Sequence, residues 1–410
     1  MKVLIASPIV FPEIAKRYHK PMPASGGWVV GYVNALLLFS SIEIVVVFES
    51  NANISESTER ISFFSVNNNL SAILNKTRPD IIHVFGTESA ISTKVLNAAR
   101  INNLDKRLVV NIQGLIHFIS KHYYSFLPLK AIIGFTLRDF KSADTVFLGK
   151  RRFSKEGKKE ISFLRQVNNV IGRTEWDQIC TNIINPNRQY YFCNEILRES
   201  FYSSKKWNPA SCEKHSIFFS QCRYPIKGFH LALEILTHLK KDFADVKLYV
   251  PSRKLIQTGF KAKLSYSYYD RYILKLIKKN HLEKNVVFLN QLNEDEMKTR
   301  FLSSHVFLSA STIENSSNSI CEAMILGVPC VASRVGGTES LLNHGKEGFL
   351  YQADATYLAY YYIKQIFEND KLAEELSVNS IKRAESVHDR KSIIENMLTI
   401  YSDILRKDQQ

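Results

Sequence analysis

Short runs of β-branched and other apolar residues alternate with longer amphipathic stretches through the first half of the chain. Strands are predicted at Val3–Ser7, Ile44–Phe48, Ile81–Phe85 and Leu108–Ile112. Helices are predicted between them at Gly27–Phe39, Leu70–Lys76 and Glu88–Ile101. Because strands that alternate with helices form βαβ units, this order predicts a parallel sheet.

The second half repeats this logic without repeating the sequence. Strands are predicted at Ser216–Ser220, Val246–Val250, Val286–Leu289, His305–Ser309 and Cys330–Ser333, and helices at Phe229–Lys240, Arg271–Lys279 and Glu294–Ser303. A chain of 410 residues is too long for one ordinary core. We therefore predict two α/β domains, residues 1–205 and 206–387, with the boundary in the polar segment between Tyr202 and Cys212.

Composition and charge narrow the class of protein. The formal net charge of +15 favours an anionic partner, such as phosphate groups, an acidic membrane surface or nucleic acid, although a basic host proteome would give the same value. The six cysteines form no CxxC pair, which favours a reduced cytoplasmic protein without structural zinc. No signal peptide is expected, because the first apolar run is short and Pro8 stops it. The apolar stretch Trp28–Phe48 changes from a helical to a strand pattern midway, so it does not predict a membrane span.

The most informative segment runs from Glu314 to Gly337 and reads ENSSNSICEAMILGVPCVASRVGG. Its centre is apolar, yet it contains Glu322, and a buried carboxylate costs several kcal/mol unless it is paired. Asn318 or Ser319 is the predicted N-cap of a short helix that ends at Gly327. Two carboxylates, a helix start and a strand end are therefore expected together, as at nucleotide sites of open α/β sheets.

This segment also resembles a known family. Two Glu residues separated by seven others, with the second in Glu-Ala-Met, then Gly-Val-Pro-Cys-Val-Ala-Ser and Gly-Gly, are similar to the signature of retaining family-4 glycosyltransferases (glycosyl transferases group 1). The resemblance implies the GT-B fold: two Rossmann-like, doubly wound domains facing across a cleft, the first for the acceptor and the second for the nucleotide-sugar donor. It also implies that the C-terminal helix, about residues 388–410, packs back onto the first domain. In these roles Glu314 contacts the donor sugar and Glu322 holds the ribose hydroxyls.

A second motif, SQCRYPIKG from Ser220 to Gly228, follows a predicted strand and precedes a helix. A Lys beside a Gly at such a turn is well placed to bind phosphate, although a solvated surface cation is the alternative. The resemblance implies that Lys227 contacts the diphosphate, together with an Arg at the end of the strand. Without a gap, Gln221 takes that Arg position, and Arg223 takes it only if the loop is shorter here.

Other candidate residues lie at glycine turns and strand ends. Gly26 and Gly27 precede the first helix and allow a ligand to approach the backbone, or form a plain turn. The resemblance places this loop beside the donor phosphates and the acceptor. The N–H groups around Asn318 and Ser319 are candidates to hold the diphosphate. The strand ends of the first domain also carry polar residues, for which a structural role is at least as plausible: His83, Glu88, Gln113, His117 and the cluster Arg173–Asp177.

The segment from Leu148 to Glu160 is strongly basic, and it follows a stretch rich in Phe and Tyr. Aromatic residues near cations suit an anionic membrane surface or a lipid-linked anionic acceptor. A solvated helix over an ordinary core is the alternative.

Together these features predict a retaining glycosyltransferase of the hexosyltransferase type. We expect it to move a sugar from a nucleotide diphosphate to a saccharide or lipid-linked acceptor in bacterial cell-surface polysaccharide synthesis. No cofactor is expected, and no metal, since no Asp-x-Asp motif is present. We also expect no nucleic acid partner. The expected location is the cytoplasm, with the inner face of the membrane as a peripheral site. A nucleotide-sugar epimerase of the same fold and a basic nucleic-acid-binding protein stay open as alternatives.

Overall fold

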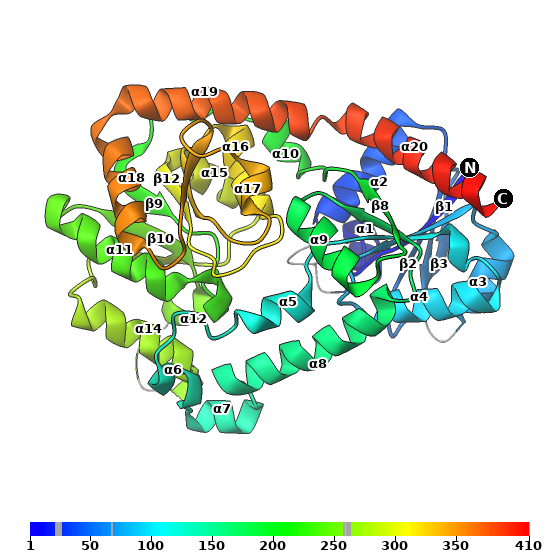
Figure 1. The fold of residues 1–410 in the computed structure, drawn as a ribbon, viewed down its shortest axis with the longest axis horizontal. Helices are drawn as coiled ribbons and strands as arrows, with labels where there is room; N and C mark the ends of the chain where they lie inside the picture. Colours follow the sequence, from blue (N-terminus) through cyan, green and yellow to red (C-terminus); the bar gives the residue numbers. More distant parts are fainter. Residues whose placement is uncertain (21–26, 67–68, 257–258, 260–263, 410) are drawn as a thin grey trace. The chain divides into compact units, whose positions relative to one another are not determined.

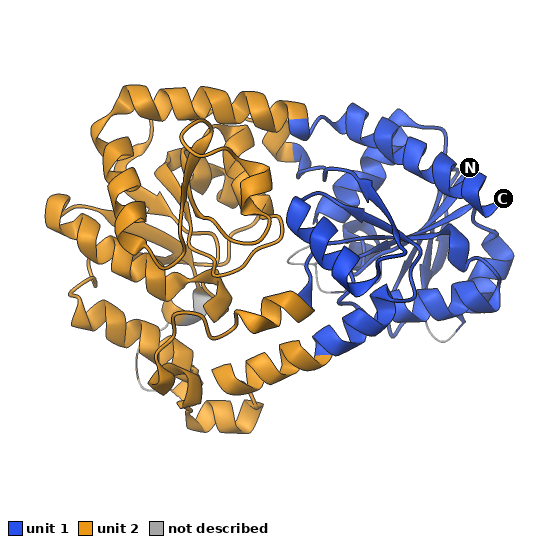
Figure 2. Cartoon of the chain, in the orientation of Figure 1, with its two compact units in different colours: residues 1–116, 156–199, 387–410 blue, residues 117–155, 200–386 orange. Residues whose placement is uncertain are grey.

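Two separate β-sheets organise the chain (Figure 1). The computed structural model describes residues 1–20, 27–66, 69–256, 259 and 264–409. Each sheet is the centre of one unit (Figure 2): unit 1 comprises Met1–Ile116, Glu156–Glu199 and Val387–Gln410, and unit 2 comprises His117–Lys155 and Ser200–Ser386. The sequence prediction assigned residues 117–155 to the first domain, whereas their packing places them in unit 2.

The sheet of unit 1 has eight strands in the order β3-β4-β2-β1-β5-β6-β7-β8. The strands are β1 (Lys2–Ala6), β2 (Glu43–Phe48), β3 (Ser55–Ser57), β4 (Ile61–Ser65), β5 (Ile81–Phe85), β6 (Leu108–Asn111), β7 (Asn169–Gly172) and β8 (Gln189–Phe192). All neighbours are parallel except β3 and β4. Every residue of β5 and β6 is buried, as expected for central strands of a sheet covered on both faces.

The helices of unit 1 are α1 (Pro12–Arg17), α2 (Gly27–Phe39), α3 (Leu70–Thr77), α4 (Ala90–Ile101), η1 (Asp105–Arg107), α9 (Glu175–Ile184) and α20 (Arg390–Asp408). The last of these, α20, packs against α2. Its Tyr401 hydroxyl lies 2.6 Å from Nδ1 of His83 on β5 and 2.9 Å from the hydroxyl of Tyr32 on α2. These buried hydrogen bonds fix the C-terminal helix on unit 1.

The sheet of unit 2 has six strands in the order β11-β10-β9-β12-β13-β14, all parallel. The strands are β9 (Glu213–Phe218), β10 (Lys247–Pro251), β11 (Val286–Leu289), β12 (Ser304–Ser309), β13 (Cys330–Ser333) and β14 (Gly348–Tyr351). The chain winds outward in one direction from β9 and in the other from β12. The order therefore reverses between these two neighbouring central strands, and ligands of such sheets bind at that point.

The helices that lie wholly or mainly in unit 2 are α6 (Leu129–Ile133), α7 (Leu137–Ser142), η2 (Pro225–Lys227), α11 (Phe229–Asp242), α12 (Arg253–Ile256), α14 (Tyr268–Lys279), α15 (Glu294–Ser303), α16 (Asn318–Leu326), α17 (Thr338–Leu341), α18 (Thr356–Glu368) and α19 (Asp370–Val387). Four of the described helices cross the division between the units: α19 at its last residue, and α5 (Ile116–Lys121), α8 (Val146–Leu164) and α10 (Glu199–Tyr202).

The prediction of two α/β domains with parallel sheets is confirmed. Every predicted strand and helix is present, with ends shifted by up to three residues. The strands that the sequence pattern missed, β3, β4, β7, β8 and β14, have only three to five residues each, so none offers a long apolar run. β8, with the residues QYYF, is also partly exposed, whereas β7 and β14 are buried. Among the described helices, none has both the length and the apolar character that crossing a bilayer requires. The stretch Trp28–Phe48 divides between α2 and β2, as predicted.

Candidate functional site

Three loops at the carboxyl edge of the second sheet meet around one residue, Glu314. The loops follow β9, β12 and β13, which are adjacent at and beside the reversal of strand order. The carboxylate of Glu314 accepts a hydrogen bond from Nζ of Lys227, at 2.7 Å, and from the hydroxyl of Ser311, at 3.3 Å. Its backbone carbonyl accepts from the N–H of Gly337, at 3.0 Å. One residue thus joins all three loops.

Two glycines make this convergence possible. Gly228 has a positive φ of 71°, and a Cβ there would lie 1.7 Å from the carbonyl oxygen of Ala310. Gly336 has a φ of 52°, and a Cβ there would lie 2.0 Å from the carbonyl oxygen of Glu314. Because both positions combine a left-handed backbone with close approach of another backbone, only glycine fits.

Buried hydrogen bonds also connect these loops to one another. The N–H of Thr312 donates to the carbonyl of Ile226, at 2.8 Å, and the hydroxyl of Ser333 donates to the carbonyl of Ser311, at 2.6 Å. Ser311, Thr312 and Ser333 are all buried. The loops are therefore rigid supports for the ion pair above them, as a preorganised site requires.

The Lys227–Glu314 pair is only partly shielded from water. The side chain of Lys227 is 26% exposed and that of Glu314 is 17% exposed. An incoming ligand can therefore reach both charges without unfolding a loop. A cation beside a carboxylate suits a ligand that carries both an anionic group and hydroxyl groups. The cation can then bind the anionic group, and the carboxylate can accept hydrogen bonds from the hydroxyls.

Helix α16 carries the second predicted carboxylate. Glu322 is buried and lies on the fifth residue of the helix, about one turn from its start, as predicted. The helix ends at Gly327 in the left-handed conformation, which confirms that part of the prediction. The predicted N-cap is wrong by one residue: Asn318 is already helical, and the extended Ser317 precedes it.

The start of α16 is partly exposed, and of its first N–H groups that of Ile320 donates to the carbonyl of Ser317, at 3.1 Å. Ser317 makes no side-chain capping bond, and Asn318 and Ser319 are partly exposed. The N–H groups of a helix's first turn have no acceptor within the helix, and the helix dipole favours an anion there. The expectation that Asn318 and Ser319 help to bind a diphosphate stays a prediction.

Gln221 and Arg223 both lie on the exposed loop after β9. The guanidinium of Arg223 lies 5.2 Å from the ring centroid of Tyr224. This loop brings neither residue into the Lys227–Glu314 hydrogen bonds. Which of the two takes the Arg position of the family is still open.

The predicted glycine loop belongs to unit 1. Gly26 lies outside the described residues. Gly27 is the exposed first residue of α2, and a Cβ there would meet only the side chain of Arg198, at 3.7 Å. The fold alone therefore does not require glycine at position 27.

The strand ends of unit 1 hold a different kind of ion pair. Arg173 follows β7 and forms an ion pair with Glu195, which follows β8, and both side chains are almost fully buried. The amide of Gln113 donates to the other Glu195 oxygen at 2.9 Å, and Nδ1 of His388 donates to the Glu195 carbonyl at 2.8 Å. Burial lowers the pKa of His388 to about 4, and the positive charge of Arg173 acts in the same direction.

Within the cluster Arg173–Asp177, the contacts of Arg173, Thr174 and Asp177 are those of the structural role considered above. Thr174 caps α9 by accepting from the N–H of Asp177, and the Asp177 carboxylate accepts from the N–H of Arg173. Both Asp177 and Arg173 are buried. Glu195 was missed, because its segment Cys193–Leu197 reads CNEIL and is not the long apolar run that made Glu322 stand out.

No group of three or more His, Cys, Asp and Glu side chains in the described part of the chain is arranged to hold a metal ion.

Comparison with known proteins shows which protein family this site is similar to. Residues 203–383, which include the whole convergence of loops, match the family model described as glycosyl transferases group 1. This segment is a group 1 glycosyltransferase domain. The predicted resemblance is thereby confirmed for the segment that carries Lys227, Glu314 and Glu322.

A curated relative of this chain is N-acetyl-alpha-D-glucosaminyl L-malate synthase of Bacillus anthracis, which is 35% identical over 142 residues. That alignment covers 33% of this chain and 35% of the relative, so the chain matches about a third of the relative's length.

Solved structures match over nearly the whole chain. Sucrose-phosphate synthase of Thermosynechococcus elongatus gives a TM-score of 0.70 at 14% identity and covers 99% of this chain and 100% of its own. Anabaena HepE, in complex with UDP and glucose, gives a TM-score of 0.67 at 15% identity, with 98% and 100% covered. Both units together have the GT-B fold, as predicted. At such low identity these structures establish the fold alone.

Proposed function

We propose that the chain is a retaining glycosyltransferase that takes a sugar from a nucleotide diphosphate. One observation carries the proposal: a group 1 domain holds the partly exposed Lys227–Glu314 pair where three strand-end loops meet. The structure of Anabaena HepE is a complex with UDP and glucose, which supports a uridine diphosphate sugar as the first donor to test.

In this proposal each residue of the site has a separate task. Lys227 and the first N–H groups of α16 neutralise the diphosphate as its bond to the sugar breaks. Glu314 accepts hydrogen bonds from hydroxyls of the transferred sugar, and Glu322 from the ribose hydroxyls. Ser311 and Gly337 hold Glu314 in place through the hydrogen bonds described above.

The reaction that we propose is a substitution at the anomeric carbon. The bond between this carbon and the diphosphate oxygen breaks, and a bond to an acceptor hydroxyl oxygen forms. The acceptor's proton passes to the departing diphosphate, so no protein base is consumed. The acceptor is a saccharide or a lipid-linked saccharide, and the configuration at the anomeric carbon is kept. Because Lys227 and the backbone donors supply the positive charge, we propose that no metal is needed.

The experiment that tests this proposal is a binding panel. The full chain is titrated with UDP-, GDP-, ADP- and dTDP-sugars, and binding is read as a rise in melting temperature, since a ligand specific for the native state stabilises it. We expect one nucleotide class to bind, and we expect Glu322→Ala to abolish the rise.

A matched control for Glu322→Ala is Glu368→Ala, at the exposed end of α18. If no nucleotide sugar binds, or if Glu322→Ala responds like Glu368→Ala, the site assignment is wrong. Turnover of the nucleotide sugar with no acceptor, producing an epimer, would favour the epimerase instead.

A further inference from the structure

Exposed large apolar side chains are concentrated in one segment of unit 2, which is far in sequence from the loops of the proposed site. Of the twenty exposed large hydrophobic residues in the described part of the chain, eight lie between Phe126 and Leu148. Six of them form what we call the α6–α7 face: Phe126, Leu129, Ile133, Phe135, Leu137 and Phe140. Single exposed hydrophobics are ordinary, but such a concentration marks an interaction surface.

The α6–α7 segment has its polar groups inside and its apolar groups outside. Thr136 and Asp139 form a capping box and are buried. The Asp139 carboxylate also accepts from the N–H of Tyr268 at 2.7 Å, and the Thr136 hydroxyl donates to the carbonyl of Tyr266. Leu137, which lies between Thr136 and Asp139 in the sequence, is 83% exposed. These hydrogen bonds pin the segment to α14, so the outward apolar face is built in.

The same segment is strongly basic. Residues 117–155 contain eight Lys or Arg and two Asp. Asp139 is buried in its capping box, and Asp144 pairs with Arg138 at 2.7 Å. The remaining cations, among them Lys130, Lys141 and Arg151, form no ion pair with a carboxylate within the described residues. The α6–α7 face therefore presents apolar side chains within an excess of positive charge.

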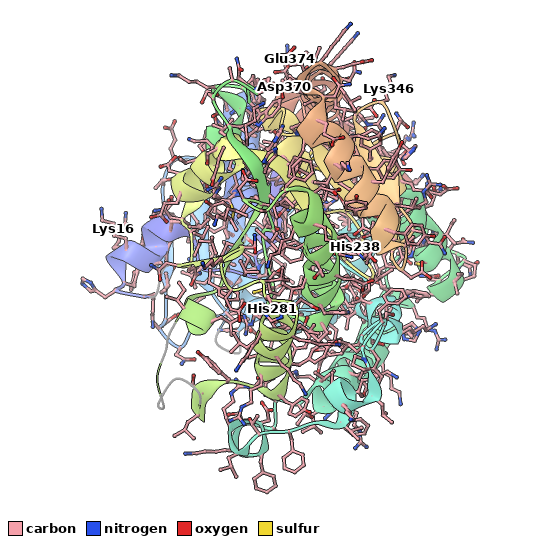
Figure 3. All side chains as sticks on the ribbon, turned by 90° about the vertical axis from the view of Figure 1, so that its left-hand side faces the viewer. Lys16, His238, His281, Lys346, Asp370 and Glu374 are labelled. Carbon is pink, nitrogen blue, oxygen red and sulfur yellow. The ribbon has the colours of Figure 1, made fainter. Side chains whose placement is uncertain are left out.

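Two acidic residues of unit 2 lie away from these cations (Figure 3). Figure 3 shows Asp370 and Glu374 at the opposite end of this unit from the teal helices α6 and α7. A second copy of the chain docked face to face would bring two positively charged faces together, which like-charge repulsion disfavours. The charge is complementary to an anionic surface that also accepts apolar side chains.

We propose that the α6–α7 face docks on an anionic lipid bilayer. The aromatic and aliphatic side chains enter the boundary between headgroups and acyl chains, and the surrounding cations contact lipid phosphates. No helix needs to span the bilayer for this attachment, because the segment lies on the surface.

Vesicle co-sedimentation of the full chain tests this proposal. We expect binding to vesicles of phosphatidylcholine mixed with phosphatidylglycerol, and weak binding to phosphatidylcholine alone. The triple variant Phe135→Ser, Leu137→Ser, Phe140→Ser removes side chains that are already exposed, and should weaken binding at least roughly ten-fold. Lys130→Gln, Lys141→Gln and Arg151→Gln together should weaken it roughly a hundred-fold at low salt.

The matched control is Leu38→Ser, Ile101→Ser, Ile183→Ser, which removes equally exposed apolar residues of unit 1. It should bind vesicles as the parent does, and all variants should keep the parent's melting temperature. Equal binding to both vesicle types, no binding, or equal loss in the control would overturn the proposal. Sedimentation velocity provides a second arm: a parent dimer that the Phe135 triple variant converts to monomer, without vesicle binding, would assign the face to self-association.

Discussion

Each unit has one cation–glutamate pair at the carboxyl edge of its sheet, and the two pairs differ in their access to water. In unit 1 the side chains of Arg173 and Glu195 are 4% and 6% exposed. In unit 2 those of Lys227 and Glu314 are 26% and 17% exposed. In both pairs the partners come from loops after different strands, so the sheet topology brings them together.

This difference in exposure indicates a structural role for the buried pair and a ligand-binding role for the partly exposed pair. Around the buried pair, the Gln113 amide donates to the Glu195 carboxylate and His388 donates to the Glu195 backbone carbonyl. Removing one partner of such a pair strands the other charge in a medium of low dielectric constant. The partly exposed pair loses little when a ligand replaces one partner. We therefore expect substitutions at the two pairs to act on different measured quantities.

The largest effect is expected at the buried pair. Arg173→Met leaves Glu195 buried without its cation and should lower the free energy of unfolding by about 3–5 kcal/mol. Chemical denaturation followed by circular dichroism measures this loss. The double variant Arg173→Met, Glu195→Gln should recover part of it, because no buried charge is then left. A loss below about 1 kcal/mol would show that the pair is more hydrated than its burial indicates.

The next effect is expected at the exposed pair, in turnover rather than stability. Lys227→Met should lower kcat/KM for the nucleotide sugar by about 10²–10³-fold, because the departing diphosphate loses its cation. Its free energy of unfolding should change by less than about 1 kcal/mol.

The matched control for Lys227→Met is Lys214→Met at the opposite end of the same sheet. Lys214 lies on β9 and pairs with Asp370 at 2.5 Å in a more exposed position. It should leave kcat/KM unchanged. Similar losses in both variants would remove the special role of Lys227.

A smaller effect concerns the pH dependence of unit 1. His388 is buried and neutral, and its pKa is lowered to about 4, whereas in the unfolded chain it is near 6.5. The unfolded state therefore binds the extra proton first, so the stabilising effect of the neutral form is present above pH 6.5 and is lost as the pH falls toward 4. At pH 5 this amounts to about 2 kcal/mol.

Replacement of that histidine makes the prediction specific. Between pH 7 and pH 5, His388→Gln should lose about 2 kcal/mol less unfolding free energy than the parent does. Other buried histidines, such as His83, His230 and His305, also have lowered pKa values, so the parent curve alone cannot assign the change. Parallel curves for parent and variant would show that His388 titrates equally in both states.

The smallest effect should decide between the two candidates on the loop after β9. Arg223→Ala should lower kcat/KM about ten-fold, as expected for one charge-assisted hydrogen bond to a phosphate. Gln221→Ala should change it less than about three-fold, because the neutral amide adds no charge. The reverse ranking, measured under the same conditions, would place Gln221 in the Arg position of the family.

The sequence predicted what depends on neighbouring residues. The apolar runs became strands because a buried parallel strand needs little more than a β-branched run, and β5, β11 and β13 match their predicted bounds. Glu322 stood out because its helix is otherwise apolar. Lys227 beside Gly228 stood out because the turn after β9 needs a left-handed residue.

Tertiary structure decided which charges meet and which face water. Lys227 and Glu314 are far apart in the chain and pair because β9 and β12 are neighbours at the reversal of the sheet. Arg173 and Glu195 are buried because their loops close over each other, which no local pattern records. The α6–α7 face is apolar outside because α14 takes the polar groups of Thr136 and Asp139 inside. Periodicity within one segment specifies its own shape, whereas burial depends on which other segments cover it.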